Sequence, residues 1–227
     1  MRTLLFFTCF ILYLPAEAQR SDFQQIDFKK ADAIARRYQG EALVHLPVLA
    51  LRLTAQLKTD VERFRVLYYW VTHNIRGTYY LTMENARLYE NWGHDPKALN
   101  EQLREFKKTV FDQLLNKKET LCTGYAFLLQ ELSGYVGLEC KIVHGYGLIN
   151  DLKALESQIP NHSWNAVKLD GKWYLCDATW ASGTIDEVTH RFEFRYDDSF
   201  FLMTPSEFAK THRPLDANWD LLQELPD

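Results

Sequence analysis

Two β-rich segments joined by Asp170-Gly171 constrain the fold of this chain more than any other feature of its sequence. Residues 163–169 and 172–178 are both rich in β-forming side chains. An Asp-Gly pair between two such runs is typical of a two-residue hairpin turn, because that turn needs residues that tolerate a positive φ. We therefore expect an antiparallel hairpin here. Further strands are expected at residues 138–146, 191–196 and 200–203.

The same turn predicts which side chains share a face of the hairpin. In the register set by a two-residue turn, Trp164 faces Asp177 and His162 faces Thr179. His162 and Asp177 are then diagonal neighbours on one face, about 7–8 Å apart at Cα and within side-chain reach. An aspartate in that place can accept an imidazole N–H and fix the histidine tautomer.

Helical periodicity precedes these strands along the chain. The most definite start is Thr59-Asp60-Val61-Glu62, which has the form of a capping box. The apolar spacing predicts helices at residues 27–39, 47–57, 59–75 and 95–114. Because helices come first and an antiparallel sheet follows, the fold class is α+β rather than alternating βαβ.

Cys122 is expected at the first turn of a further helix. Thr120-Leu121 precede it, and the helix-forming, apolar-patterned residues 127–132 follow it. The exposed N–H groups and the dipole of a helix start favour a thiolate, which is the form that attacks carbonyl carbons. A buried structural cysteine is the simpler alternative, and position alone does not decide between the two.

Cys122, His162 and Asp177 together supply a nucleophile, a base and a residue that orients the base. We therefore predict that these three residues are catalytic. A His–Asp pair by itself is more often a structural hydrogen bond, so the prediction depends on the three residues meeting in the fold.

The remaining cysteines and histidines give weaker indications of a functional role. Cys140 and Cys176 lie in expected strands as small buried side chains, although a disulfide between them is open because export would permit one. The sequence has no C-x-x-C, and its histidines are scattered, so we expect neither a zinc site nor any other metal or cofactor. His212 has no partner that the sequence reveals.

The first residues resemble a secretory signal. Arg2 precedes an apolar run from Leu4 to Leu14, and Ala16-Glu17-Ala18 supplies small residues for a signal peptidase. The run is too short to span a bilayer comfortably, which disfavours an uncleaved anchor. We expect residues 1–18 to be a signal peptide, the mature chain to begin at Gln19, and the protein to be secreted or periplasmic without stable membrane insertion.

We expect the rest of the chain to consist of an N-terminal helical segment at residues 19–58 and a catalytic domain at residues 59–227. The formal net charge is −4, and no basic patch stands out, which disfavours nucleic acid as a partner.

Three motifs resemble those of the transglutaminase-like superfamily, whose members use a papain-like Cys–His–Asp arrangement. They read Leu121-Cys122-Thr123-Gly124-Tyr125-Ala126, Asn161-His162-Ser163-Trp164-Asn165-Ala166-Val167 and Trp173-Tyr174-Leu175-Cys176-Asp177-Ala178-Thr179-Trp180, and they occur in the family's order. Residues 69–75 and the tail at residues 196–222, with its His-x-Pro, are most similar to the kyphoscoliosis peptidase-like branch and its bacterial relatives.

The resemblance implies a cysteine on a central helix that packs against an antiparallel sheet carrying the histidine and the aspartate. It implies acyl transfer through a thioester, with a protein or peptide as substrate. A peptidase or amidase is the favoured activity, and a protein-glutamine transglutaminase is the alternative. A non-catalytic interaction module is the alternative of another class. The backbone N–H of Cys122 is the oxyanion donor that the motif allows us to place.

Overall fold

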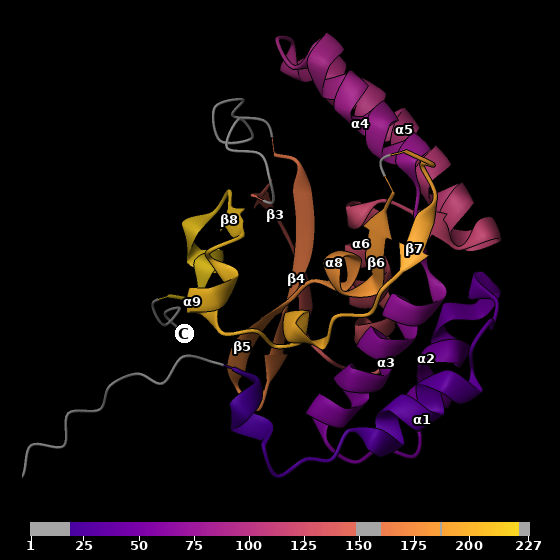
Figure 1. Cartoon of the computed structure of the whole chain (residues 1–227), viewed down its shortest axis with the longest axis vertical. Coiled ribbons are helices and arrows are strands. Elements are labelled where there is room, and N and C mark those ends of the chain that lie inside the picture. The colour runs from indigo at the N-terminus through magenta and orange to yellow at the C-terminus, as the bar shows by residue number, and fades with distance from the viewer. Residues whose placement is uncertain (1–18, 149–159, 187, 223–227) are drawn as a thin grey trace, which may run out of the picture.

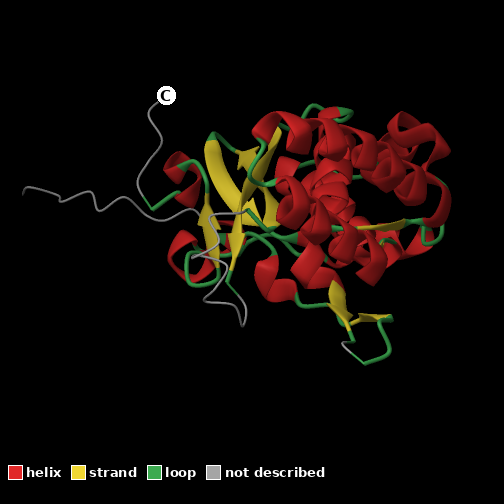
Figure 2. Ribbon diagram, turned by 90° about the horizontal axis from the view of Figure 1, so that it is seen from above, coloured by secondary structure: helices red, strands yellow, loops and turns green. Residues whose placement is uncertain are grey.

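The computed structural model describes residues 19–148, 160–186 and 188–222. Most of the helices lie together on one side of the main sheet (Figure 2), and the sheet is antiparallel, so the predicted α+β class is confirmed. The predicted signal peptide, residues 1–18, falls outside the described residues. Among the described residues, no helix combines the length and the apolar character that crossing a membrane requires.

Three helices form the first layer of the core. They are α1 (Lys29–Arg37), α2 (Leu46–Thr54) and α3 (Asp60–Asn74), and a 3-10 turn, η1 (Arg20–Phe23), precedes them. The capping box predicted at the start of α3 is present, because Thr59 accepts the Glu62 backbone N–H while the Glu62 side chain accepts that of Thr59. All three helices bury apolar side chains in one shared core.

A long helical hairpin projects from this core (Figure 1). Its second arm, α5 (Pro96–Lys117), begins at the predicted Asp95-Pro96, where Asp95 accepts two backbone N–H groups. Its first arm, α4 (Tyr79–Trp92), was not predicted. The apolar pattern of α4 is weak because its two buried side chains are Leu81 and Leu88.

The central helix is α6 (Cys122–Gly134), whose side chains are buried on most of its faces. Gly124 lies where a Cβ would overlap the side chain of the buried Thr120. Glycine is therefore required in the first turn of α6, and this close approach ties the start of the helix to the segment that precedes it. The side chain of Asn165 donates to the carbonyl of Ala126 at 2.9 Å, which joins α6 to the sheet.

The main sheet is antiparallel and has the strand order β5-β4-β3-β8. Its strands are β3 (Cys140–Gly147), β4 (His162–Leu169), β5 (Lys172–Cys176) and β8 (His212–Pro214). The predicted hairpin register is confirmed from Leu169–Lys172 to Asn165–Cys176. The edge strand β8 was not predicted.

Both faces of this sheet are covered. Val167 and Leu169 of β4 point into the core formed with the helices, whereas Trp164 and Ala166 pack on the other face against Phe208 of α9 (Pro205–Phe208). This explains why β4 is buried nearly throughout its length.

The predicted hairpin is too long at one end. We expected β5 to continue through Ala178, with Asp177 opposite Trp164, but the strand ends at Cys176. Asp177 instead accepts the backbone N–H groups of two following residues and begins the short helix α8 (Ala178–Ser182). Aspartate is a strong helix N-cap, and this local preference ends the strand.

The last part of the chain contains short elements. β6 (Gly183–Ile185) pairs with β7 (Phe192–Phe194), and β7 falls within the strand expected at residues 191–196. The strand expected at residues 200–203 is wrong, because its first residue is the last one of a 3-10 turn, η3 (Asp198–Phe200), and the stretch makes a single bridge through Met203. Two further elements are a parallel pair, β1 (Arg76–Gly77) with β2 (Glu119–Thr120), and the turn η4 (Ala217–Asp220).

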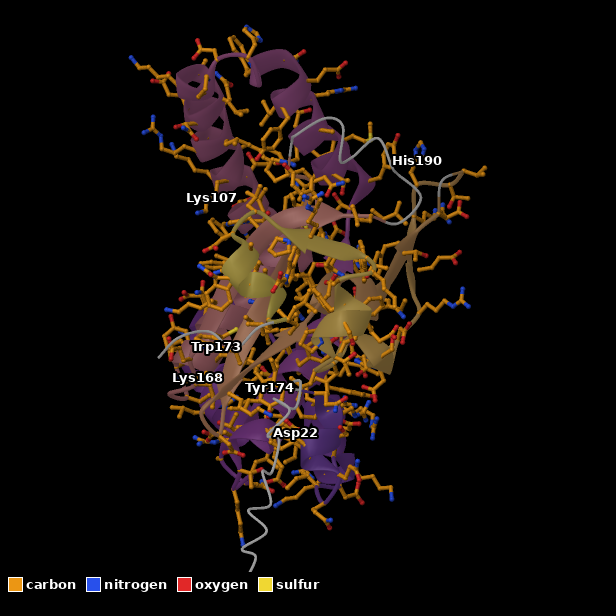
Figure 3. The ribbon with its side chains drawn as sticks, turned by 90° about the vertical axis from the view of Figure 1, so that its left-hand side faces the viewer. Asp22, Lys107, Lys168, Trp173, Tyr174 and His190 are labelled. Carbon is orange, nitrogen blue, oxygen red and sulfur yellow. The ribbon has the colours of Figure 1, made fainter. Side chains whose placement is uncertain are left out.

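The segment before α1 is tied to the far end of the sheet. Asp22 accepts the Tyr174 hydroxyl at 2.9 Å (Figure 3). Asp22 also pairs with Lys172 of β5 at 3.1 Å. In the helical layer, the buried Arg65 guanidinium pairs with Asp32 at 2.7 Å and also with Asp198. Residues on both sides of position 58 therefore share one packed body.

Candidate active site

A cleft of about 1270 Å³ opens between the helical hairpin and the sheet. Cys122 and His162 both line it. One wall is a stripe of α4 residues at helical spacing, namely Thr82, Asn85, Ala86, Tyr89 and Glu90. The opposite wall comes from β6 and from residues 195–198. The helix that was not predicted thus forms a side of the cleft.

Cys122 is the first residue of α6 and is half-buried. Burial by itself would raise the pKa of its thiol. The hydrogen bond and charge of His162, together with the backbone N–H of Ser163, outweigh burial and hold that pKa below its ordinary value. The thiolate is therefore favoured at a helix start inside the cleft.

His162 begins β4 and is buried. Its Nε2 atom lies 2.7 Å from Asp177 Oδ2, so Nδ1 is the ring nitrogen left for the thiol. Burial would lower the pKa of His162, but the Asp177 carboxylate and the contact with Cys122 raise it to about 10. A thiol pKa that is lowered beside an imidazole pKa that is raised favours transfer of the thiol proton to the imidazole.

Trp180 stacks on the His162 ring. Its ring lies 4.6 Å from that of His162 at an interplanar angle of 18°, and it lines the cleft. The two tryptophans that flank the hairpin differ in their surroundings. Trp164 is buried in the core, whereas Trp180 is half-buried beside the imidazole.

Asp177 is fully buried and has a second imidazole partner, His212 of β8. The Nε2 atom of His212 lies 3.1 Å from Asp177 Oδ2, the same oxygen that His162 contacts. Burial opposes ionisation of Asp177, but both histidines favour its charged form and hold its pKa well below the usual range. Sequence reasoning missed His212, and its one signal was the His-x-Pro pattern in the tail.

The side-chain nitrogen and oxygen atoms of His162, Asp177 and His212 that are able to bind a metal ion all lie within 4.8 Å of one another. The two histidines are far apart in the sequence, but the fold brings both of them to one aspartate. Both nitrogen–oxygen distances, 2.7 and 3.1 Å, are those of N–H···O hydrogen bonds. We therefore assign the group as one carboxylate that accepts from two imidazoles.

The other two cysteines are buried and do not line the cleft. Cys140 and Cys176 are free thiols, and the disulfide left open by the sequence is not formed. The two residues lie on β3 and β5, on either side of β4. Strands are spaced about 4.8 Å apart, so two strand spacings exceed the Cα separation that a disulfide spans. Burial raises the pKa of Cys140 to about 12 and that of Cys176 well above its ordinary value.

The structure thus brings the three predicted residues together at one end of the sheet, with Cys122 from α6, His162 from β4 and Asp177 from the start of α8. A cysteine-bearing helix that packs against an antiparallel sheet is the architecture of the papain-like and transglutaminase-like class. Residues 47–178 match the family model described as the transglutaminase-like superfamily, and the chain belongs to that superfamily.

Two relatives agree with this assignment. The chain is 33% identical over 205 residues to human kyphoscoliosis peptidase, a match that covers 89% of this chain and 27% of that protein. It is 27% identical over 229 residues to hillarin of Drosophila melanogaster, covering 92% of this chain and 25% of hillarin. The superfamily and the branch predicted from the motifs are therefore confirmed.

The chain spans about a quarter of the length of these two relatives. Among solved structures, a TGase crystal structure aligns with a TM-score of 0.37 and 14% identity, covering 80% of this chain and 40% of that one.

Proposed function

We propose that this chain is an exported cysteine enzyme that transfers the acyl group of a peptide-like amide through a thioester on Cys122. The observation that supports this most directly is the pairing of Cys122 with His162 in the cleft. The contact lowers the pKa of the thiol and raises that of the imidazole, although burial favours the neutral form of both. Perturbation of this kind in a cleft is typical of active sites.

The residues define a sequence of steps. The Cys122 thiolate attacks the amide carbonyl carbon, and the backbone N–H of Cys122 at the α6 terminus stabilises the developing oxyanion. His162 then gives its proton to the leaving amine as the C–N bond breaks, which leaves a thioester. For hydrolysis, His162 takes a proton from water, whose oxygen attacks the thioester, and the carboxylic acid leaves while Cys122 is restored. Asp177 keeps the imidazole oriented in both halves of the reaction.

Water is the acceptor that we favour. A human relative is called a peptidase, and the cleft is open and large enough for a peptide segment rather than only a small ligand. Transfer to a primary amine is the alternative, because the superfamily takes its name from that reaction. The same thioester serves both outcomes, so the acceptor is a question for experiment.

A single assay separates hydrolysis, transamidation and the absence of catalysis. Purified protein is incubated with β-casein and a biotinylated primary amine, and mass spectrometry counts new peptide termini and amine-labelled glutamines. We expect new termini with the wild-type protein and background levels with Cys122→Ala. The Cys122→Ala effect is expected because the thiolate forms the only covalent bond to the substrate in the proposed reaction.

The matched control is Cys140→Ala, which removes a buried thiol on β3 outside the cleft and should keep the activity. Amine-labelled glutamines without new peptide termini would show that the protein transamidates its substrate rather than hydrolysing it. If casein and a tryptic peptide pool both remain unmodified by a protein whose Cys122 is reactive, the non-catalytic interaction module becomes the better account.

Export is a separate part of the proposal and rests on residues 1–18. We expect protein recovered from the exported fraction of a bacterial host to have an intact mass that begins at Gln19. Recovery of a membrane-bound form that retains residues 1–18 would show an anchor in place of a cleaved signal.

A further inference from the structure

The Asp177 carboxylate has four hydrogen-bond donors around it. Oδ1 accepts the backbone N–H groups of Thr179 at 2.7 Å and Trp180 at 3.1 Å. Oδ2 accepts from His162 at 2.7 Å and from His212 at 3.1 Å. A carboxylate has about four lone-pair directions, so all of its accepting capacity is used. The backbone donors fix Oδ1, and the two imidazoles share Oδ2.

His212 is held tightly in this position. Its side chain is fully buried, and its ring stacks on Phe208 at 3.8 Å and 20° and lies 4.3 Å from Trp180. Burial keeps the pKa of His212 below its ordinary value, so the ring is neutral near pH 7. A neutral ring facing a carboxylate carries its proton on Nε2. Its Nδ1 lies 2.9 Å from the Thr211 hydroxyl, and the backbone carbonyl of Phe208 also contacts the ring.

Two donors at one oxygen compete for its negative charge. His162 needs an anionic partner, yet its pKa of about 10 lies well above neutrality. In general acid–base catalysis the best pKa lies near the working pH, because the same group must give up a proton and later accept one. A second, neutral donor on Oδ2 weakens the hold of Asp177 on the His162 proton without removing the carboxylate.

We propose that His212 is a positioning residue of this site, whose neutral imidazole holds Asp177 Oδ2 at His162 Nε2 and takes up part of its charge. The inference rests on the proposed function. The titratable groups that contact the Asp177 carboxylate in the described structure are His162 from β4 and His212 from β8. The Tyr68 hydroxyl of α3 reaches the backbone carbonyl of Asp177 at 3.0 Å, and the Tyr125 hydroxyl and the Cys176 thiol lie close enough for the charge of Asp177 to raise their pKa values. Cys122 lies beyond His162.

Three variants separate this role from simple packing. His212→Phe keeps an aromatic ring but removes the donor, and His212→Gln can place an amide N–H near the position of Nε2. His73→Phe is the matched control, because His73 of α3 is also stacked and half-buried but lies away from the carboxylate. The readout is the rate of Cys122 alkylation by iodoacetamide from pH 4 to pH 9, together with the melting temperature.

We expect the midpoint of the alkylation profile to move to lower pH by about one unit in His212→Phe. The reason is that Asp177 then stabilises the imidazolium more strongly, and one pH unit is a tenfold change in the ion-pair equilibrium. His212→Gln should restore most of the wild-type profile, and His73→Phe should match the wild type. A folded His212→Phe protein with no shift, or with a shift to higher pH, overturns the proposal. Equal behaviour of the Gln and Phe variants does so as well.

A measurement on the wild-type protein applies even if the Phe variant does not fold. Imidazole ¹⁵N NMR at pH 7 should show that His212 is neutral and carries its proton on Nε2. A charged His212, or one protonated only on Nδ1, overturns the proposal. Neither experiment uses a substrate, so a failure of the proposed acyl transfer is seen separately, as a wild-type protein whose Cys122 is alkylated but which leaves β-casein unmodified.

Discussion

Asp177→Asn is expected to lower acyl transfer by up to about 10⁴-fold, the loss that the matching change gives in the serine-protease triad. The asparagine can keep a carbonyl oxygen toward the two backbone N–H groups at the start of α8. Its NH₂ group then meets the Nε2 atoms of His162 and His212, which donate to the aspartate. His162 must turn or change tautomer, and it no longer presents the correct nitrogen to Cys122. The loss can be smaller than in a serine enzyme, because a thiol needs the base less.

The same substitution should also lower stability. A buried donor that loses its acceptor costs about 1–3 kcal/mol, which corresponds to about 2–4 °C in melting temperature per kcal/mol for a chain of this size. The paired measurement is melting temperature and the rate of acylation of Cys122 by an activated ester. The control is Asp186→Asn, which changes an exposed turn carboxylate that accepts the N–H groups of Val188 and Thr189. A folded Asp177→Asn protein that acylates at the wild-type rate would remove Asp177 from the site.

Iodoacetamide is expected to modify Cys122 well below pH 8 while Cys140 and Cys176 stay unmodified. The pKa of Cys122 is lowered through His162, whereas burial raises the pKa of Cys140 to about 12 and that of Cys176 well above its ordinary value. The thiolate is the reactive form, so its fraction decides the rate. Peptide mapping after brief exposure at pH 6.5 measures the three sites in one experiment.

His162→Ala should slow this labelling sharply. Without the imidazole, the two contributions of His162 that lower the thiol pKa are lost, while burial and the Asp177 charge still raise it. Each unit of rise lowers the thiolate fraction at pH 6.5 by about tenfold. The matched control is His73→Phe, which should label at the wild-type rate. Similar labelling of all three cysteines across this pH range would show that Cys122 is an ordinary thiol.

Features encoded by neighbouring residues were predictable from the sequence. The hairpin register follows from Asp170-Gly171, which adopt positive φ as the turn requires. The start of α3 follows from Thr59 and Glu62, whose side chains satisfy the first N–H groups of the helix. In both cases the interacting groups lie within a few residues, so their geometry depends little on the rest of the fold.

Features without a strong local pattern were missed. Helix α4 buries Leu81 and Leu88 and presents a polar stripe to the cleft, so its apolar period is too weak to predict a helix. Strand β8 has three residues and exists because it pairs with the edge of β3. The end of β5 was predicted wrongly because Asp177 can either continue the strand or cap a helix. It caps α8, which packs against α3 and α6.

The sequence by itself determined that this chain carries a helix-start cysteine and a histidine and an aspartate on one hairpin, and its motifs identified the superfamily. Tertiary structure decided how these groups act on one another. The pairing of Cys122 with His162, and the arrival of His212 at an aspartate 35 residues away in the chain, depend on how α6 and β8 pack against β3 and β4. Hydrogen bonds and pKa shifts depend on distance and burial, and the packing of distant segments sets both.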